Sequence, residues 1–174
     1  RIKVRVGELE GYVAKKYIFE TEEDGEWYLL STSTTKAGAN TNRDININIA
    51  SSYINGKILQ PNEKFSFWDT VGKCTYDKGY KDATVYSNGK KTKGIGGGVC
   101  QVSTTVNMAV KSAGIKTNAR QHSLPVSYAS REDEATVSFG NIDFKFTNTT
   151  GKTIMLVMGA VDGSCTCEVW AKYE

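Results

Sequence analysis

The sequence predicts an α+β domain in which a bent, mostly antiparallel sheet carries about two helices. Two observations favour this fold: two segments repeat apolar residues at helical steps of three and four, and a long C-terminal stretch alternates as strands do. The chain has 174 residues, 39% of them hydrophobic, which is enough for one core. No apolar run approaches the roughly 20 residues that cross a bilayer, so we expect no transmembrane segment in this chain.

The first 30 residues differ in texture from the rest and are predicted to form a separate N-terminal strand segment. The stretch VRVGELEGYVAKKYI alternates like paired short strands around a glycine turn. Within it, GELEGYVAKKYI resembles the closing strands of a small bacterial wall-binding barrel of the Src-homology type. Two interpretations stay open, the end of such a barrel or a docked hairpin, and residues 31–174 form the main domain.

Two helices are predicted in the main domain, over about 43–55 and 100–113. The first has its apolar residues on one face and is followed by Gly56, and the second, with Val102, Val106 and Val110 on one face, is followed by Gly114. Between them, FSFW at 65–68 predicts a short strand. Residues 70–98 show no sustained period, so we expect mostly loop there.

The remainder is predicted to be β structure. Turn residues such as NTTGK and VDGS separate five alternating segments, KTNARQH, ATVSFG, DFKFTN, TIMLVMGA and CTCEVWAKY.

Charge and cysteine content exclude several function classes. With 22 basic and 19 acidic residues the net charge is +3, which is too mild to indicate nucleic-acid binding. A chain of this length does not need its four cysteines as a disulfide framework. Cys165 and Cys167 are predicted to be small residues on one sheet face, or one of them pairs with Cys74.

Cys100, His122, Cys165 and Cys167 together make a nominal zinc-binding set. Its C-x-C spacing on a strand separates the two sulfurs by about 6.5–7 Å, which is wide for shared tetrahedral ligation. We therefore expect neither a metal nor a cofactor.

The segment GIGGGVCQVSTT, residues 94–105, is the one with a chemical pattern. Four glycines precede Cys100, which is placed where the second helix begins. Unpaired amides at a helix start favour a thiolate, so the pKa of Cys100 is predicted to be lowered. Amides near Gly97, Gly98 and Cys100 would also stabilise an oxyanion.

A cysteine nucleophile needs a base, and the only imidazole of the chain is His122. A helix followed by a returning strand can bring it beside Cys100. The alternative is an inert buried thiol beside a packing glycine loop, with His122 as an ordinary strand residue.

Several blocks, in this order and spacing, resemble the VanW family across about residues 40–150: PNEKFSFWDTVG, KGYKDATV, GIGGGVCQVSTT, the HS pair of RQHSLPVSY, and DEATVSFGNIDFKFTN. The run GGGVCQVSTT is the most specific of them. The resemblance implies a bacterial cell-envelope module, located outside the cell in the wall or at the surface. It also implies L,D-transpeptidase activity, the formation of 3-3 cross-links in peptidoglycan through a cysteine thioester.

Under this resemblance Cys100 is the nucleophile, His122 is the acid and base, and peptidoglycan stem peptides are the partners of a monomeric enzyme. Further residues are predicted to bind substrate or support the site: Gly97, Gly98, Gln101, Ser103, Thr104, Ser123 and Tyr80. Local helix-start hydrogen bonds are an equal alternative for Ser103 and Thr104, a simple turn role for Ser123, and a core position for Tyr80. Arg43 and Glu63 are predicted to form a structural ion pair.

Two rival functions stay open. The domain would be a non-catalytic wall-binding module if the glycine loop only receives an anion and Cys100 is structural. It would be a cysteine endopeptidase if water takes the place of the acceptor amine.

Overall fold

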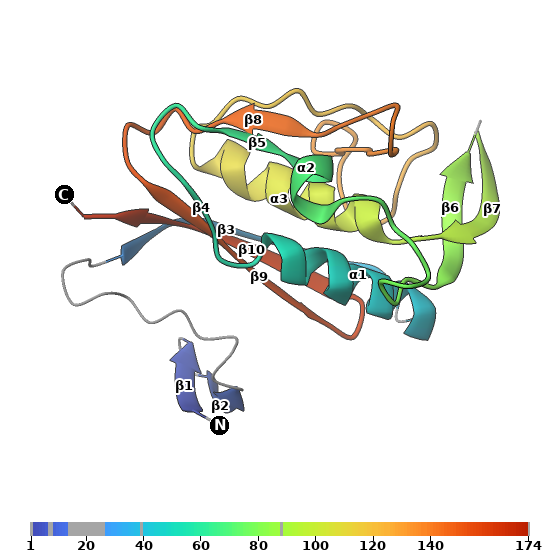
Figure 1. The fold of residues 1–174 in the computed structure, drawn as a ribbon, viewed down its shortest axis with the longest axis horizontal. Coiled ribbons are helices and arrows are strands. Elements are labelled where there is room, and N and C mark those ends of the chain that lie inside the picture. Colours follow the sequence, from blue (N-terminus) through green and yellow to red (C-terminus); the bar gives the residue numbers. More distant parts are fainter. Residues whose placement is uncertain (1, 7–8, 14–26, 39, 88, 174) are drawn as a thin grey trace.

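The computed structural model describes residues 2–6, 9–13, 27–38, 40–87 and 89–173. A four-stranded antiparallel sheet in the order β3-β10-β9-β4 forms its centre (Figure 1). Its strands are β3 (Trp27–Lys36), β10 (Ser164–Lys172), β9 (Ile154–Val161) and β4 (Lys57–Leu59). Helices α1 (Thr41–Ile54) and α3 (Val99–Ser112) pack against this sheet and against each other. The predicted α+β class is confirmed.

The core lies between the two helices and the sheet. Every second residue of β10 is buried, which places Cys165, Cys167, Val169 and Ala171 on the face that the helices cover. Cys165 Sγ lies 3.8 Å from Ser51 Oγ of α1. All four cysteines are free thiols, so Cys74 is paired with neither of the β10 cysteines.

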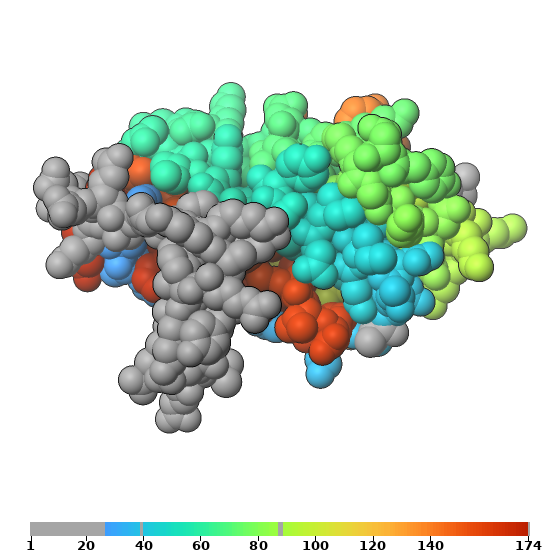
Figure 2. All heavy atoms as spheres, turned by 60° about the horizontal axis from the view of Figure 1, so that its bottom comes forward, coloured from blue at the N-terminus to red at the C-terminus, as the bar shows by residue number. Residues whose placement is uncertain are grey.

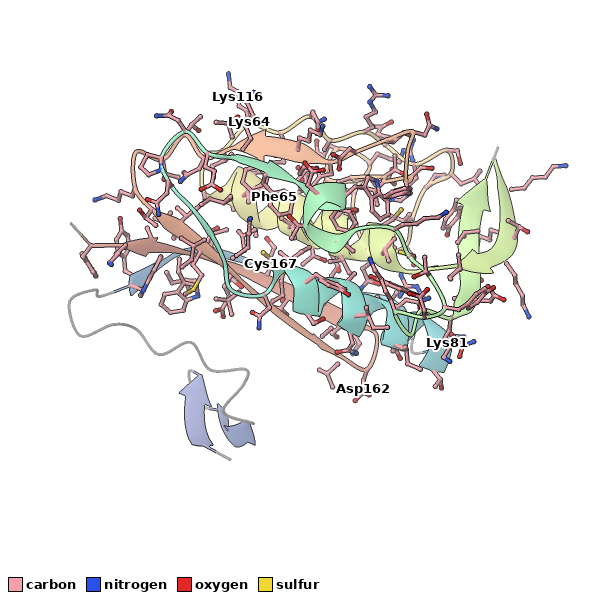
Figure 3. All side chains as sticks on the ribbon, in the orientation of Figure 1. Lys64, Phe65, Lys81, Lys116, Asp162 and Cys167 are labelled. Atoms are coloured by element: carbon pink, nitrogen blue, oxygen red, sulfur yellow. The ribbon has the colours of Figure 1, made fainter. Side chains whose placement is uncertain are left out.

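Side chains of the two-stranded sheet β5 (Lys64–Ser66) and β8 (Lys145–Thr147) close the core on the other side of the helices. Figure 3 shows Phe65 pointing inward from β5 and Cys167 lying in the interior, whereas Lys64 projects outward. Phe65 stacks on Phe146 of β8, with ring centroids 4.9 Å apart.

Both predicted helices are present, within two residues of their expected ends. The side chain of Asn40 accepts a hydrogen bond from the Arg43 amide and so begins α1. Gly114, at φ 82°, follows the end of α3, as a C-terminal glycine does. The N-terminal ends of α1 and α3 both lie toward the hairpin of β6 (Asp82–Ser87) and β7 (Lys90–Ile95) (Figure 1).

That hairpin corrects the expectation of a mostly loop-like stretch over 70–98. Strand β7 is KKTKGI, and its first four residues are exposed, so it has no apolar alternation by which to recognise it. The strand predicted at 65–68 is also shorter than expected. It ends at Ser66, whose side chain accepts from the Asp69 amide and begins the five-residue helix α2 (Phe67–Val71).

Two predicted strands, KTNARQH and ATVSFG, are irregular segments with only isolated bridges. Their backbone groups are satisfied in other ways. The Thr136 amide donates to the Arg120 carbonyl, the Ala135 amide donates to Thr104 Oγ1, and the Ala135 carbonyl accepts from Ser103 Oγ. Side chains of α3 thus replace a neighbouring strand.

At the N-terminus, β1 (Ile2–Val6) and β2 (Leu9–Val13) pair antiparallel, with Ile2 opposite Val13. The rest of the predicted N-terminal pairing, at 14–18, lies outside the described residues. Strand β3 crosses the predicted boundary between residues 30 and 31, because Trp27 already pairs with Lys172 of β10. The division into two domains stays a prediction.

The face of the molecule in Figure 2 shows α1 between two neighbours. Residues 57–80 lie above it, and the turn between β9 and β10 lies below. The residues in the first turn of α1 are exposed or partly exposed, and they lie at the end of the helix near the β6–β7 hairpin.

Candidate functional site

A groove of about 820 Å³ lies at the end of the molecule where α1 and α3 begin. It is lined from α1, α2, the β6–β7 hairpin, the glycine turn, the first turn of α3 and the irregular segments 121–128 and 136–142. The residues that line the groove include Arg43, Lys73, Cys74, Tyr86, Gly96, Gly97, Gly98, Cys100, His122, Ser123, Tyr128, Thr136 and Val137.

The glycine turn is required by close packing and by backbone conformation. A Cβ at Gly97 would lie 2.6 Å from the Thr84 carbonyl oxygen, and one at Gly96 would lie 2.9 Å from Cys74 Sγ. Gly98 has φ 113°, a left-handed conformation that L side chains rarely adopt. The turn therefore has a structural reason for each glycine, in addition to any that a ligand supplies.

Amide groups of this turn are free to receive a ligand. Among the described residues, no acceptor takes the N–H groups of Gly97, Gly98 or Cys100, whereas Val99 and Gln101 donate to Gly96 and Gly98. Unpaired amides in the first turn of a helix carry partial positive charge. Their position at the groove matches the chemistry needed for an oxyanion.

Cys100 is in the first turn of α3 and is partly exposed to the groove. Its sulfur lies 3.5 Å from the Val137 carbonyl oxygen and 3.9 Å from Thr136 Oγ1. Burial raises the pKa of the Cys100 thiol, while hydrogen bonds at Val137 and Thr136 and the charge of Arg43 lower it by less. The prediction of a lowered pKa is therefore wrong, because desolvation outweighs these lowering contacts.

His122 lies in an irregular segment and not on a strand. The side chain of His122 is buried, and the residue is 3% exposed. Its backbone amide donates a hydrogen bond of 2.9 Å to Oε2 of the buried Glu134 carboxylate. Burial lowers the pKa of His122 below its ordinary value of 6.5; Glu134 acts in the opposite direction and Arg131 in the same one. The imidazole is therefore neutral at physiological pH.

Two tyrosines surround the His122 ring. Tyr128 Oη lies 3.5 Å from His122 Nε2, and the two rings meet edge to face. The Tyr86 ring centroid lies 6.0 Å from that of His122. Burial is also the largest cause that raises the pKa of Tyr128, so its hydroxyl keeps its proton.

Cys100 and His122 line the same groove, 22 positions apart in the sequence. No hydrogen bond joins the sulfur to the imidazole in the described residues; the sulfur instead contacts Thr136 and Val137, and Nε2 contacts Tyr128. The charge of a Cys100 thiolate would affect Tyr128, so this tyrosine is near both groups.

Of the other predicted site residues, Gly97, Gly98 and Ser123 line the groove, whereas four do not: Gln101, Ser103, Thr104 and Tyr80. All four are fully buried. Gln101 donates to the carbonyls of Thr35 and Gly163, on the side of α3 that faces the sheet. Ser103 and Thr104 hold the segment at Ala135, which is a scaffold contact.

Three groove or support residues carry no sequence pattern that singles them out: Arg43, Tyr128 and Glu134. Arg43 was expected to pair with Glu63, but in the part of the chain that the structure describes its buried Nη1 atom has no hydrogen-bond partner. Glu63 accepts from the Gln60 amide instead. The guanidinium carbon lies 5.6 Å from the centroid of the Tyr128 ring. The sequence offers one indication of the role of Arg43: it shares a helix face with apolar residues of α1.

In the described residues, no three His, Cys, Asp or Glu side chains gather as metal ligands do. Over the same part of the chain, no helix is long and apolar enough to cross a membrane.

Comparison with known proteins places the chain in a family. Residues 42–170 match the family model described as "VanW like protein". The chain is 39% identical over 145 residues to the uncharacterized protein YoaR of Bacillus subtilis (strain 168), which covers 83% of this chain and 46% of that protein. It is 30% identical over 142 residues to the vancomycin B-type resistance protein VanW of Enterococcus faecalis (strain ATCC 700802 / V583), covering 76% of this chain and 46% of that protein. The chain thus spans about half the length of these relatives, and no solved structure matches it significantly.

Proposed function

The chain belongs to the VanW-like family, and from this membership and the chemistry of the groove we propose that it is a cysteine-dependent L,D-transpeptidase of peptidoglycan. Its substrates are stem peptides outside the cell, in the wall or at the surface. Its product is a 3-3 cross-link.

One arrangement carries this proposal: a thiol in the first turn of a helix and the sole imidazole of the chain line one groove, beside amides that have no acceptor among the described residues. A nucleophile, a base and an oxyanion receptor are the three parts that acyl transfer requires.

The protonation states suit general-base activation. Burial keeps Cys100 as a thiol and His122 as a neutral imidazole. With the pKa of the thiol raised and that of the imidazole lowered, the proton stays on the sulfur in the free site, which therefore holds no reactive thiolate. The imidazole takes this proton as the sulfur attacks the carbonyl. Since no hydrogen bond joins sulfur and ring in the described residues, the proposal requires that the two approach each other when a substrate binds.

The proposed reaction then has two steps, formation of the thioester and its transfer to the acceptor amine. Cys100 Sγ attacks the carbonyl between residues three and four of the donor stem as its proton moves to His122. The C–N bond breaks, His122 returns the proton to the leaving D-amino acid, and a thioester remains. The side-chain amine of an acceptor stem attacks the thioester, gives a proton to His122, and the released sulfur takes that proton back.

A pair of cysteine variants tests this proposal, because Cys74 and Cys100 both line the groove but only Cys100 begins α3. Cys100→Ala should lose formation of 3-3 dimers from purified muropeptides to background, while Cys74→Ala should retain most of it. Mass spectrometry of the wild-type reaction should show the stem peptide attached to Cys100 with loss of one D-amino acid.

Dimer formation that is unchanged in Cys100→Ala overturns the proposal. Shortened stems without dimers would identify an endopeptidase or carboxypeptidase acting through the same thioester. Binding of muropeptides without any product, in wild type and variant alike, would identify a wall-binding module.

A further inference from the structure

Arg43 brings an unpaired positive charge to the groove. It lies in the first turn of α1 and lines the groove, and one of its guanidinium nitrogens is buried with no hydrogen-bond partner among the described residues. No carboxylate of the described residues forms an ion pair with it. A buried donor without an acceptor is costly, so such a group usually has a partner that the free protein lacks.

The fold holds this side chain against the turn that precedes Cys100. A Cβ at position 98 would lie 2.9 Å from Arg43 Cγ and 3.2 Å from the Arg43 carbonyl oxygen. Gly98 is therefore what allows the stem of Arg43 to lie there. Tyr128 covers the guanidinium from another side, at 5.6 Å from ring centroid to Cζ.

The charge around the groove has one sign. Its described lining residues include Arg43 and Lys73 and no aspartate or glutamate. Lys73 is exposed, whereas Arg43 is partly buried, and the unpaired amides before Cys100 add partial positive charge. A ligand group that fits beside Arg43 is therefore an anion, and the planar guanidinium favours a carboxylate.

We propose that Arg43 binds the free carboxylate of the residue that Cys100 expels from the acyl donor. This inference rests on the proposed function. In that residue the carboxylate is separated from the cleaved nitrogen by a single carbon, so its receptor has to lie beside the nucleophile, as Arg43 does. One further residue would move the carboxylate by about 3.3–3.8 Å. Arg43 thus selects stems that end one residue after the cleaved bond.

Binding to a protein that cannot react tests this inference apart from catalysis. Cys100→Ala protein is titrated calorimetrically with a tetrapeptide muropeptide that ends in a free D-alanine carboxylate, and with the same muropeptide ending in a carboxamide. The acid should bind about tenfold or more tightly, the scale of one charge-assisted hydrogen bond in a partly buried site.

Adding Arg43→Gln should bring the two affinities within about twofold of each other. Adding Arg120→Gln removes the same charge from an exposed position outside the groove and should keep the preference for the acid. Urea unfolding of each protein shows whether it is folded. If Arg43→Gln does not fold, Arg43→Lys replaces it, and a point charge without the planar fork should reduce the preference by more than half.

Equal affinity for acid and amide in Cys100→Ala protein overturns the inference, as does absence of binding or a preference that survives Arg43→Gln. If the preference depends on Arg43 but wild-type protein forms neither thioester nor dimer, the carboxylate site stands and the transpeptidase proposal fails. If dimers form and the acid and amide bind alike, the transpeptidase proposal stands and the carboxylate site fails.

Discussion

The residue on which the proposed chemistry depends, Cys100, is subject to two opposing effects. The helix start favours a thiolate, and burial favours the thiol. Burial raises the pKa of Cys100 by more than the contacts with Val137, Thr136 and Arg43 lower it. A thiol is less readily oxidised than a thiolate, so a raised pKa also protects this residue from oxidation.

The alkylation rate of Cys100 should therefore inflect at a higher pH in the native protein than in the unfolded one. The measurement uses Cys74→Ala protein with iodoacetamide, since Cys165 and Cys167 are fully buried in the fold. The same titration in concentrated urea supplies the reference near the free-thiol value of about 8.5. A native inflection below the unfolded one would show that the helix start dominates after all.

A second residue-scale prediction concerns Glu134, whose side chain is fully enclosed. It accepts from the amides of His122 and Val126 and pairs with Arg131 at 2.7 Å. Glu134→Gln removes the charge that these donors face, so it should lower the free energy of unfolding in urea by about 2–4 kcal/mol.

The matched control is Asp133→Asn. Asp133 directly precedes Glu134 in the sequence, and its carboxylate pairs with Lys111 at the surface. It should cost less than about 1 kcal/mol. Equal losses in the two variants would mean that Glu134 does not hold the segment of His122.

At the scale of the elements, the glycine turn connects β7 to α3 and packs against strand β6. Gly97→Ala should destabilise the protein by about 1–3 kcal/mol, because its Cβ would meet Thr84 O and Ala83 Cβ at 2.6 and 2.8 Å. Gly159→Ala is the control, since no atom lies within 4 Å of its Cβ. Urea unfolding measures both, and a Gly97→Ala protein as stable as Gly159→Ala would contradict the packing argument.

The elements also differ in how far the sequence predicts them. Helices α1 and α3 have an apolar face and a glycine beyond the end, so period and stop are visible together. Strand β7 presents lysines to solvent, so it shows no apolar face by which to recognise it. Its partner β6 offers only Ala83 and Val85 in alternation with polar residues, which is a weak strand signal. The segments around His122 and Thr136 look like strands because they alternate. Instead, side chains of α3 satisfy the backbone at Ala135, and the carboxylate of Glu134 accepts from the His122 amide.

The candidate site follows the same rule. Cys100 and the glycines are recognisable because a reactive residue type meets an unusual local pattern. Arg43 and Tyr128 approach the groove from α1 and from the 121–128 segment only once the chain has folded, so no local pattern marks them. Gln101 belongs to the same motif as Cys100 but faces the sheet, since adjacent helical residues point in different directions.

For the molecule as a whole, the open question from the sequence is where the main domain begins. Strands β1 and β2 pair only with each other among the described strands. A chain that starts at Trp27 should therefore unfold in urea at the same concentration as the full chain. A chain that starts at Ser31, the predicted boundary, should be less stable by about 2 kcal/mol, because it loses three ladder pairs with β10.

The lost contacts are specific. Tyr28 pairs with Ala171 and its ring lies 4.5 Å from that of Tyr173, while Leu30 packs against the core. The variant Tyr28→Ala, in the chain that starts at Trp27, should reproduce about half of the loss. Equal stability of the two shortened chains would place the boundary at residue 31 and make the first third of β3 dispensable. A loss already present in the chain that starts at Trp27 would show instead that the N-terminal hairpin stabilises the main sheet.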